Sequence, residues 1–342
     1  MGGLEAPSHG MTHQAALAGR RVLVTGATGM VGSALTHELL EAGAHVAALV
    51  LDADPQTELF RSGDIQRVAV VSGALEDLAT LERAIRLHAV DTVFHLGAQT
   101  LVGAAHHAPL YTFEANIRGT YNLLEACRRQ SDLVRCVVVA SSDKAYGEQA
   151  LPYTETAPLL GRHPYEVSKS CADMLAQCYA HTYGLPVAIA RCGNVYGGGD
   201  LNWSRIVPGT IRDLLHDRRP IVRSDGTYVR EYLYVKDTVA AYLCLAAHVG
   251  RDGVRGEAFN FGDDAPATVL DIVASLQRLT HREHLAPEIH NQATGEIPRQ
   301  SLSSAKAQRV LGWSVRHRRE EALAETIDWY RRYFQKTTPD VA

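Results

Sequence analysis

The chain has 342 residues, of which 46% are hydrophobic and 21% are charged, and its formal net charge at pH 7 is −4. A chain of this length and composition is globular, forms one large domain or two smaller ones, and has no apolar stretch long enough to span a bilayer. The absence of a basic excess argues against nucleic acid as its main partner.

The predicted elements follow a leader. Residues 1–19 are rich in Gly, Ala and His but lack the basic start and apolar run of a signal peptide, and we interpret them as a flexible leader. The six cysteines form no Cys-x-x-Cys pair and lie in apolar or helical segments, which is typical of reduced thiols and predicts a cytoplasmic protein. The spacing of the histidines does not favour a metal site.

Continuous apolar runs alternate with amphipathic stretches over the first half of the chain. Strands that lack polar alternation and are separated by helices are typical of a parallel sheet covered on both faces, and right-handed connections make such a sheet doubly wound. We therefore predict an α/β fold with a Rossmann-type, doubly wound parallel sheet. The predicted strands are residues 21–25, 46–50, 68–71, 92–96, 136–140 and 187–190, and the predicted helices include 30–42, 75–87, 115–129 and 167–183.

The alternation fades after Gly193. An irregular region is expected to run to Arg230, followed by a helix, one more strand and a mostly helical tail, at residues 235–249, 258–261 and 320–334. We expect a smaller, mostly helical lobe over the carboxyl ends of the strands, where such sheets bind ligands. The predicted nucleotide-binding domain comprises residues 20–193 and 231–262, and the substrate lobe comprises residues 194–230 and 263–336.

A glycine-rich turn joins the first predicted strand to the first predicted helix. Glycines in this place let the backbone approach a pyrophosphate, and the helix N-terminus supplies unpaired N–H groups and positive potential. The strand–turn–helix context predicts a dinucleotide site, with a tight turn without ligand as the alternative. The residues assigned to the cofactor in this turn are Gly26, Thr28, Gly29, Met30, Val31 and Gly32, with Leu75, Leu96 and Ala98 after later strands.

Asp52 follows the second predicted strand by two residues. A carboxylate there accepts hydrogen bonds from both hydroxyls of an adenosine ribose and repels a 2′-phosphate, which predicts NAD as the cofactor in preference to NADP. Asp54 is the alternative for this role, and a solvated loop carboxylate is the other interpretation of either residue.

Tyr165 and Lys169 lie four residues apart and therefore project from the same face of a helix. A lysine ammonium beside a phenol favours the phenolate, so Tyr165 is a candidate base near neutral pH, and the Ser142 hydroxyl completes a proton-handling trio. Asp143 and Lys144, directly after this serine, form a second candidate acid/base pair. The alternatives are an ordinary helix face for the first pair and an exposed ion pair at a strand end for the second.

These motifs together resemble the extended short-chain dehydrogenase/reductase family, which includes nucleotide-sugar epimerases and dehydratases. The similarity extends over nearly all of residues 20–335. Matching segments besides the glycine turn, Ser141–Gly147 and Tyr165-x-x-x-Lys169 are residues 95–99, 116–120, 230–237 and 311–313.

Within the family, Ser142-Asp143-Lys144 is similar to the hydroxyl–Asp–Lys triplet of the CDP-glucose 4,6-dehydratase group. Residues 194–200 and 203–208 resemble the same group. The chain departs from that group at Glu231-Tyr232, and it has Ala74 where an aspartate near the adenine is common, so the base and the sugar stay open.

The resemblance implies roles for these residues. Tyr165 would remove the proton of a hexose C4 hydroxyl while hydride passes to NAD, and Ser142 would bridge hydroxyl and phenol. Lys169 would lower the pKa of Tyr165 and hold the nicotinamide ribose, so that Tyr165 and Lys169 are cofactor-binding residues as well. Asp143 would then protonate the departing C6 hydroxyl, which requires burial to keep it neutral. Lys144, made partly neutral by burial and by the charge of Lys169, would act as the base at C5.

The expected product is a 4-keto-6-deoxy sugar, and the expected substrate is a nucleotide-diphosphate sugar. Gln99 and Thr100 should face the hexose, while Asn194, Arg205 and Arg230 are candidates to hold the diphosphate, because guanidinium groups suit phosphate oxygens. Surface solvation is the alternative for the arginines. A nucleotide-sugar 4-epimerase and a catalytically silent nucleotide-binding protein are the competing functions, and the resemblance also implies a homodimer.

Overall fold

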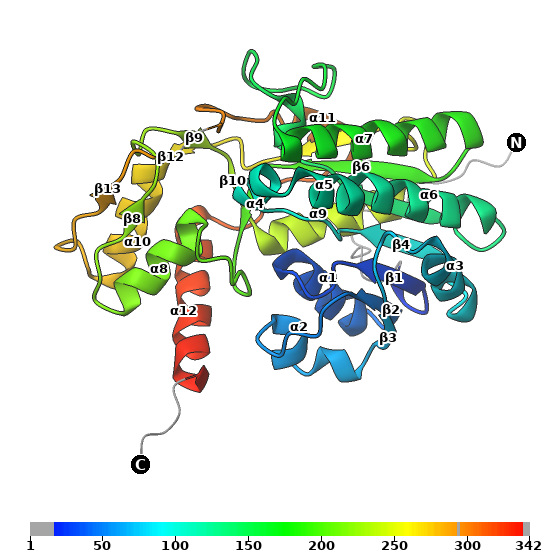
Figure 1. Cartoon of the computed structure of the whole chain (residues 1–342), viewed down its shortest axis with the longest axis horizontal. Helices are drawn as coiled ribbons and strands as arrows, with labels where there is room; N and C mark the ends of the chain where they lie inside the picture. The colour runs from blue at the N-terminus through cyan, green and yellow to red at the C-terminus, as the bar shows by residue number, and fades with distance from the viewer. Residues whose placement is uncertain (1–16, 293–294, 338–342) are drawn as a thin grey trace, which may run out of the picture.

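The computed structural model describes residues 17–292 and 295–337, and within these ranges seven parallel strands form one central sheet in the order β11-β6-β5-β4-β1-β2-β3. From β1 the chain winds first through β2 and β3 to one edge and then through β4, β5 and β6 towards the other, which confirms the predicted doubly wound topology (Figure 1). The strands are β1 Arg21–Thr25, β2 His45–Val50, β3 Ala69–Ser72, β4 Thr92–His95, β5 Cys136–Ala140, β6 Val187–Cys192 and β11 Ala258–Phe261.

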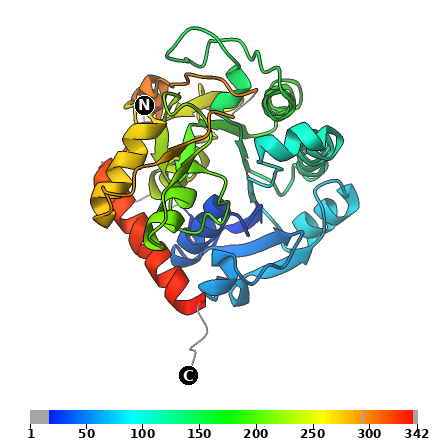
Figure 2. The ribbon, with the colours of Figure 1, turned by 60° about the vertical axis from the view of Figure 1, so that its left-hand side comes forward.

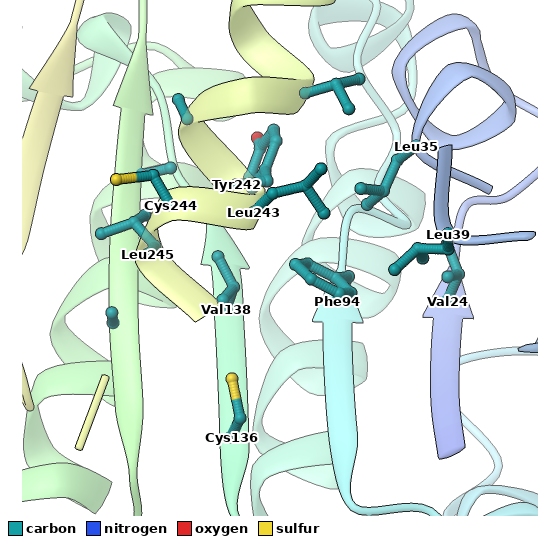
Figure 3. Packing of buried hydrophobic residues seen from close by; sticks show 14 of the residues in the cluster. Val24, Leu35, Leu39, Phe94, Cys136, Val138, Tyr242, Leu243, Cys244 and Leu245 are labelled. Atoms are coloured by element: carbon teal, nitrogen blue, oxygen red, sulfur yellow. The ribbon is translucent and has the colours of Figure 1, made fainter. Parts of the chain in front are cut away.

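Helices cover both faces of the sheet, as its nearly unbroken apolar strands require. Side chains of α1 (Met30–Glu41) and α9 (Val235–His248) pack on one face, where Phe94 meets Leu39 and Leu243 in a buried cluster (Figure 3). The other face is covered by α3 (Leu78–Leu87), α6 (Gly119–Arg129) and α7 (Pro164–Tyr183). These two layers fix the carboxyl ends of the strands, where the candidate residues gather.

Helix α7 begins three residues earlier than the sequence pattern predicts. His163 is its N-cap, Pro164 occupies the first helical position, and the Glu166 carboxylate accepts the N–H groups of Arg162 and His163 at 2.9 and 3.2 Å. This is a capping box, and proline is well tolerated at the first position because its missing N–H has no intrahelical partner there. Gly184 ends the helix in a left-handed conformation with φ of 68°.

Two predicted boundaries need correction. The leader predicted for residues 1–19 ends earlier, because Leu17 is buried in the core and the Arg20 N–H donates to its carbonyl; residues 1–16 lie outside the described residues. The irregular region predicted after Gly193 contains helix α8 (Ile206–Leu215). Pro208 lies in the first turn of α8, where its missing N–H removes no helical hydrogen bond.

The predicted second lobe lies to one side of the sheet in Figure 1. Its core is formed by α8, α10 (Val269–Thr280) and α12 (Arg319–Thr337), with Ile211, Leu276 and Leu323 fully buried. Three two-stranded pairs complete it, namely β7 Asn194–Tyr196 with β10 Tyr232–Tyr234, β8 Ile221–Val222 with β13 Glu288–Ile289, and β9 Val229–Arg230 with β12 Ala267–Thr268. The remaining helices are α2 Glu58–Arg61, α4 Val102–His107, α5 Pro109–Phe113 and α11 Ala305–Leu311, and none of the helices in the described ranges is long and apolar enough to cross a membrane.

Helix α12 connects this lobe to the first half of the chain. The Tyr333 hydroxyl donates to Gln56 Oε1 at 3.3 Å, and the guanidinium of Arg61 lies 4.4 Å from the centre of the Tyr333 ring. Figure 2 shows the C-terminal end of α12, in red, beside the blue segments that contain α2. A Cβ on Gly199 would lie 3.4 Å from Glu58 Cβ and 3.9 Å from Met30 Cα, so the turn after β7 runs close to the N-terminus of α1.

Candidate active site

The glycine turn holds the first strand and the first helix close together. A Cβ on Gly32 would lie 2.0 Å from the Gly26 carbonyl oxygen, so only glycine fits there. Gly29 is the N-cap of α1 without a side-chain capping bond, and the first turn contains no acidic residue. The N-terminal N–H groups of α1 are thus free of a capping side chain, as an anion site at a helix N-terminus requires.

Residues from three strand ends meet at this turn. Gly26 has φ of 71°, and a Cβ on it would lie 2.7 Å from the Gly97 N and 2.9 Å from the Leu96 carbonyl carbon. A Cβ on Gly97 would in turn lie 3.0 Å from Leu75 Cδ1. The structure therefore brings the predicted cofactor residues Gly26, Leu75 and Leu96 together, next to Ala98.

Asp52 lies just beyond the end of β2, exposed, and its carboxylate has no hydrogen bond to any of the described residues. Asp54, the alternative, accepts the Gln56 N–H at 2.9 Å and stabilises its own turn. These two features fit a dinucleotide. Its diphosphate would bind at the uncapped N-terminus of α1, and its ribose would bind at the Asp52 carboxylate.

Ser142, Asp143 and Lys144 lie at the carboxyl end of β5, where the chain enters a one-turn 3₁₀ helix, the Asp143–Tyr146 turn. Ser142 caps this turn, accepting the Lys144 N–H at 3.2 Å, and its hydroxyl donates to Asp143 Oδ1 at 3.0 Å. Asp143 is 1% exposed, and its Oδ2 has no hydrogen-bond partner among the described residues. The Lys144 ammonium lies 3.6 Å from Asp143 Oδ1 and donates to Asn194 Oδ1 at 2.9 Å. The alternative of an exposed ion pair is wrong, since only 20% of the Lys144 side chain is exposed.

Tyr165 and Lys169 share the buried face of α7, and the Ser142 hydroxyl acts on the Tyr165 phenol, lowering its pKa. The expectation that Lys169 lowers the pKa of Tyr165 needs correction. Burial raises the pKa of Tyr165 to about 12, with Asp143 adding to the rise, and the cation that opposes it is Arg205. The Lys169 ammonium donates to the Ala140 carbonyl oxygen at 2.9 Å, and burial lowers its own pKa to about 8.

The pKa of Lys144 is lowered by burial, as predicted, but not by the charge of Lys169. Burial lowers the pKa of Lys144, Asp143 opposes this, and Arg230 and Arg205 lower the pKa further. The predicted contribution of Lys169 is not among these causes. The lowered pKa of Lys144 is thus retained, but two arginines, and not Lys169, supply the positive field.

The predicted substrate residues lie around this pair. Arg230 is 6% exposed and donates to the Val229 and Pro298 carbonyl oxygens at 2.9 and 3.1 Å. Arg205 is the N-cap of α8 and pairs with Asp200 at 3.2 Å. The charges of both arginines act on Lys144, which is also the residue that donates to Asn194.

Gln99 and Thr100 follow β4. The Gln99 N–H donates to Asn116 Oδ1 at 2.7 Å and its Nε2 donates to the Leu101 carbonyl at 3.1 Å, while its buried Oε1 has no partner among the described residues. Thr100 is exposed. Gln99 thus retains a free acceptor for a hydroxyl.

Sequence analysis missed three charged residues next to the site. Glu296 lies 3.4 Å from the Arg230 guanidinium, and Asp173 forms a buried ion pair with Arg191 at 2.8 Å. Only Asp173 had a local signal, since it continues the four-residue spacing of Tyr165 and Lys169 along α7. The other two are brought in by chain segments distant in sequence.

Comparison with known proteins agrees with this geometry. The sequence matches the profile described as "NAD dependent epimerase/dehydratase family" over residues 22–262. It is 31% identical to the CDP-glucose 4,6-dehydratase of Salmonella typhimurium, over 93% of this chain and 92% of that protein. The fold is similar to the dTDP-glucose 4,6-dehydratase DesIV of Streptomyces venezuelae, solved with NAD bound, with a TM-score of 0.84, 28% identity and coverage of 93% and 99%. It is also similar to the UDP-glucose 4-epimerase of Thermotoga maritima, solved with UDP-glucose, with a TM-score of 0.82, 27% identity and coverage of 92% and 99%.

Proposed function

This chain belongs to the NAD dependent epimerase/dehydratase family, and we propose that it is a 4,6-dehydratase of a nucleotide-diphosphate hexose. The observation that carries the proposal is the buried Asp143–Lys144 pair, which directly follows Ser142, the residue whose hydroxyl acts on the Tyr165 phenol. Such a site has one set of groups for oxidation at C4 and a second set for elimination across C5 and C6. The 4,6-dehydratases among the relatives support the same reaction.

NAD is the cofactor, and the turn from Gly26 to Gly32 would hold its diphosphate while Asp52 would hold its adenosine ribose. When bound, it supplies a reversible hydride acceptor, so that the sugar can lose hydride at C4 and regain it at C6. We assign residues 20–193 and 231–262 to cofactor binding, and residues 194–230 and 263–336 to the nucleotide sugar.

The first step requires a base at the C4 hydroxyl, and Tyr165 is that base. Burial opposes the phenolate, so positive charge has to offset it, and Arg205 is the cation whose charge acts on this phenol. Ser142 would bridge the phenol and the sugar hydroxyl when substrate is bound, which would give the proton a path between them.

The 4-ketone acidifies the C5 proton, which opens the elimination step. Lys144 removes this proton, the C5–C6 double bond forms as the C6–O bond breaks, and Asp143 protonates the departing oxygen, which leaves as water. The Asp143 Oδ2, which is buried and has no hydrogen-bond partner among the described residues, is the oxygen free to contact the leaving group. Return of hydride to C6 and of a proton to C5 gives the 4-keto-6-deoxy sugar without net redox change.

The nucleotide sugar binds across the two lobes in this proposal. Arg205 and Arg230 hold the diphosphate together with Asn194, while Gln99 and Thr100 contact the hexose. A diphosphate beside these arginines partly cancels the positive field on Lys144, which raises its pKa towards that of an ordinary lysine. Substrate binding and the charge of the C5 base are thereby coupled.

A nucleotide-sugar 4-epimerase is the second candidate function. The similarity to the UDP-glucose 4-epimerase of Thermotoga maritima favours it, because Ser142, Tyr165 and Lys169 suffice for oxidation and reduction at C4. Epimerisation requires no catalytic role for Asp143 and Lys144, however, and burying an ion pair costs folding free energy. A silent binding protein is disfavoured more strongly, since the complete trio is in place.

One experiment separates these functions. The purified protein is incubated with CDP-, dTDP-, GDP- and UDP-hexoses in deuterated water, and the products are identified by NMR. Dehydration gives a 4-keto-6-deoxy sugar with deuterium at C5, whereas epimerisation gives an unlabelled C4 epimer, and no turnover despite bound NAD favours the silent protein. Tyr165→Phe serves as the control, since it lacks the base for the first step.

We also propose that the protein is a cytoplasmic homodimer that joins through α6 and α7, which lie side by side in Figure 1. Tyr121 on α6 and Met174 on α7 are 39% and 53% exposed, and Leu110 and Tyr111 on the adjoining α5 are 71% and 54% exposed. Large apolar side chains gathered on neighbouring helices are typical of an interaction surface. All six cysteines are free thiols, which fits a reducing compartment.

A further inference from the structure

The buried face of α7 carries a third residue in line with the two proposed catalytic ones. Tyr165, Lys169 and Asp173 follow at intervals of four, and Asp173 is 0% exposed. Its carboxylate is bound by Arg191 of β6 through two parallel hydrogen bonds, Nε to Oδ2 and Nη2 to Oδ1, both 2.8 Å long. The proposed chemistry gives this ion pair no task.

The third nitrogen of Arg191 reaches the segment that carries the second acid/base pair. Its Nη1 donates to the Tyr146 hydroxyl at 2.8 Å, and the guanidinium lies 4.9 Å from the centre of the Tyr146 ring. The Tyr146 hydroxyl in turn donates to Asn260 Oδ1 at 2.7 Å. Tyr146 is fully buried and ends the Asp143–Tyr146 turn.

Further hydrogen bonds hold the same turn. Asn260 Nδ2 donates to the Tyr153 carbonyl oxygen at 3.0 Å, and the Tyr153 hydroxyl donates to the Gly147 carbonyl oxygen at 2.7 Å. One continuous buried network therefore runs from α7 through β6 to the turn and on to β11. A second link is shorter, since Ser170 Oγ donates to the Ala145 carbonyl oxygen at 3.0 Å.

We propose that Asp173, Arg191 and Tyr146 are positioning residues, which hold Asp143 and Lys144 in register with Tyr165 and Lys169 for the elimination step. This inference rests on the proposed dehydratase function. The network holds Tyr146, which lies in the same turn as Asp143 and Lys144, whereas Tyr165 and Lys169 lie on α7 itself. Loosening the network therefore displaces the groups for elimination more than the groups for oxidation.

The test is Tyr146→Phe, which keeps the ring and removes only the hydroxyl that joins Arg191 to Asn260. Misplacement of catalytic groups by about 1 Å slows a step by up to roughly 100-fold. We expect kcat for dehydration to fall by about 10- to 100-fold with KM for the nucleotide sugar nearly unchanged. Because oxidation continues while elimination slows, the steady-state fraction of reduced NAD on the enzyme should rise, which absorbance measures directly.

Tyr183→Phe is the matched control, because Tyr183 lies on the same helix but is 55% exposed. It should leave kcat and the fraction of reduced NAD at wild-type values. A fall in kcat for Tyr146→Phe without any rise in reduced NAD overturns the proposal, since a general loss of structure slows both steps.

Asp173→Glu gives a second measurement if Tyr146→Phe does not fold. It keeps the charge but lengthens the side chain, so the two hydrogen bonds with Arg191 shift and reduced NAD should again accumulate. A wild-type fraction of reduced NAD in this variant counts against a positioning role. Failure of the proposed dehydratase function is distinguishable from failure of this positioning role. In the first case the wild-type protein itself incorporates no deuterium at C5 of any hexose.

Discussion

At the scale of single residues, Lys144 is placed where two carboxylates and two arginines act on the same ammonium group. Burial, Arg230 and Arg205 favour its neutral form, while Asp143 and Glu296 favour its charged form, and the net effect is a lowered pKa. A lowered pKa brings this amine closer to what a general base requires.

Lys144→Met removes this base and keeps the length of the side chain. We expect exchange of the C5 proton with solvent to fall by about 100-fold or more, while the reduction of bound NAD by the nucleotide sugar stays measurable. Proton exchange is read by NMR in deuterated water, and reduction by absorbance. Lys236→Met, at a half-exposed lysine paired with Glu325, is the control. Exchange at the wild-type rate in Lys144→Met would remove this residue from the mechanism.

Glu231 is a buried carboxyl of which neither oxygen receives a hydrogen bond within the described chain. Burial and the facing carboxylate of Asp263 raise its pKa to about 9. Between its ordinary pKa of 4.5 and about 9, the folded protein therefore holds a proton that the unfolded chain has lost. The free energy of unfolding consequently falls as the pH rises through this window.

Glu231→Gln keeps the shape of the side chain and is neutral at every pH, so it removes the contribution of Glu231 to the change of unfolding free energy with pH. We expect the stability of Glu231→Gln relative to the wild type to grow with pH, by at most about 1.4 kcal/mol per unit between about pH 6 and pH 8. Urea unfolding of both proteins at pH 6 and pH 8 measures this difference in the free energy of unfolding. Glu283→Gln changes an exposed carboxylate in the same way and should give no such trend. Equal slopes for Glu231→Gln and the wild type would mean that Glu231 is ionised in the folded protein.

At the scale of secondary structure elements, the turn between β1 and α1 depends on one close approach. Gly32→Ala places a Cβ 2.0 Å from the Gly26 carbonyl oxygen, so the turn has to move. We expect a loss of about 1–3 kcal/mol in the free energy of unfolding, together with loss of the NAD retained on purification. Thermal melting and chromatography of the nucleotide released by denaturation measure the two effects. Gly103→Ala in α4 meets no atom within 4 Å and should change neither, and full NAD content in Gly32→Ala would contradict the predicted site.

The elements that could be predicted from the sequence are those with a continuous local signal. The strands of the central sheet are buried on both faces, which demands unbroken apolar runs such as residues 136–140. The spacing of Tyr165 and Lys169 similarly places both on one face of α7 without knowledge of the rest of the fold. The same reasoning identified Ser142, Asp143 and Lys144, because they follow directly after a strand.

Other features depend on segments that meet only after folding. The β7–β10 pair comprises three residues on each side, too few for a periodic pattern, and it forms because residues 194–196 and 232–234 come together. The arginines that act on Lys144 are 61 and 86 residues away from it in sequence, as their numbers show. The raised pKa of Tyr165 could not be predicted for the same reason. Its main cause is burial, which depends on segments that meet only after folding.

At the scale of the whole molecule, the proposed dimer makes a direct prediction. Met174→Arg places a charge on the exposed face of α7, where a partner helix would have to bury it, and the cost of such burial should shift the protein to monomers. Light scattering coupled to size-exclusion chromatography measures the mass. Leu87→Arg, at a leucine of α3 that is 72% exposed, is the matched control and should leave the mass unchanged. A Met174→Arg protein with the wild-type mass would exclude α7 from the interface.

The contact between Tyr333 and Gln56 joins residues that are 277 positions apart in the sequence. Ribosomes release a chain from its N-terminus, so the nucleotide half of this molecule can fold before residue 333 has been made. The segment that contains Gln56 therefore gains this contact only when synthesis is nearly complete.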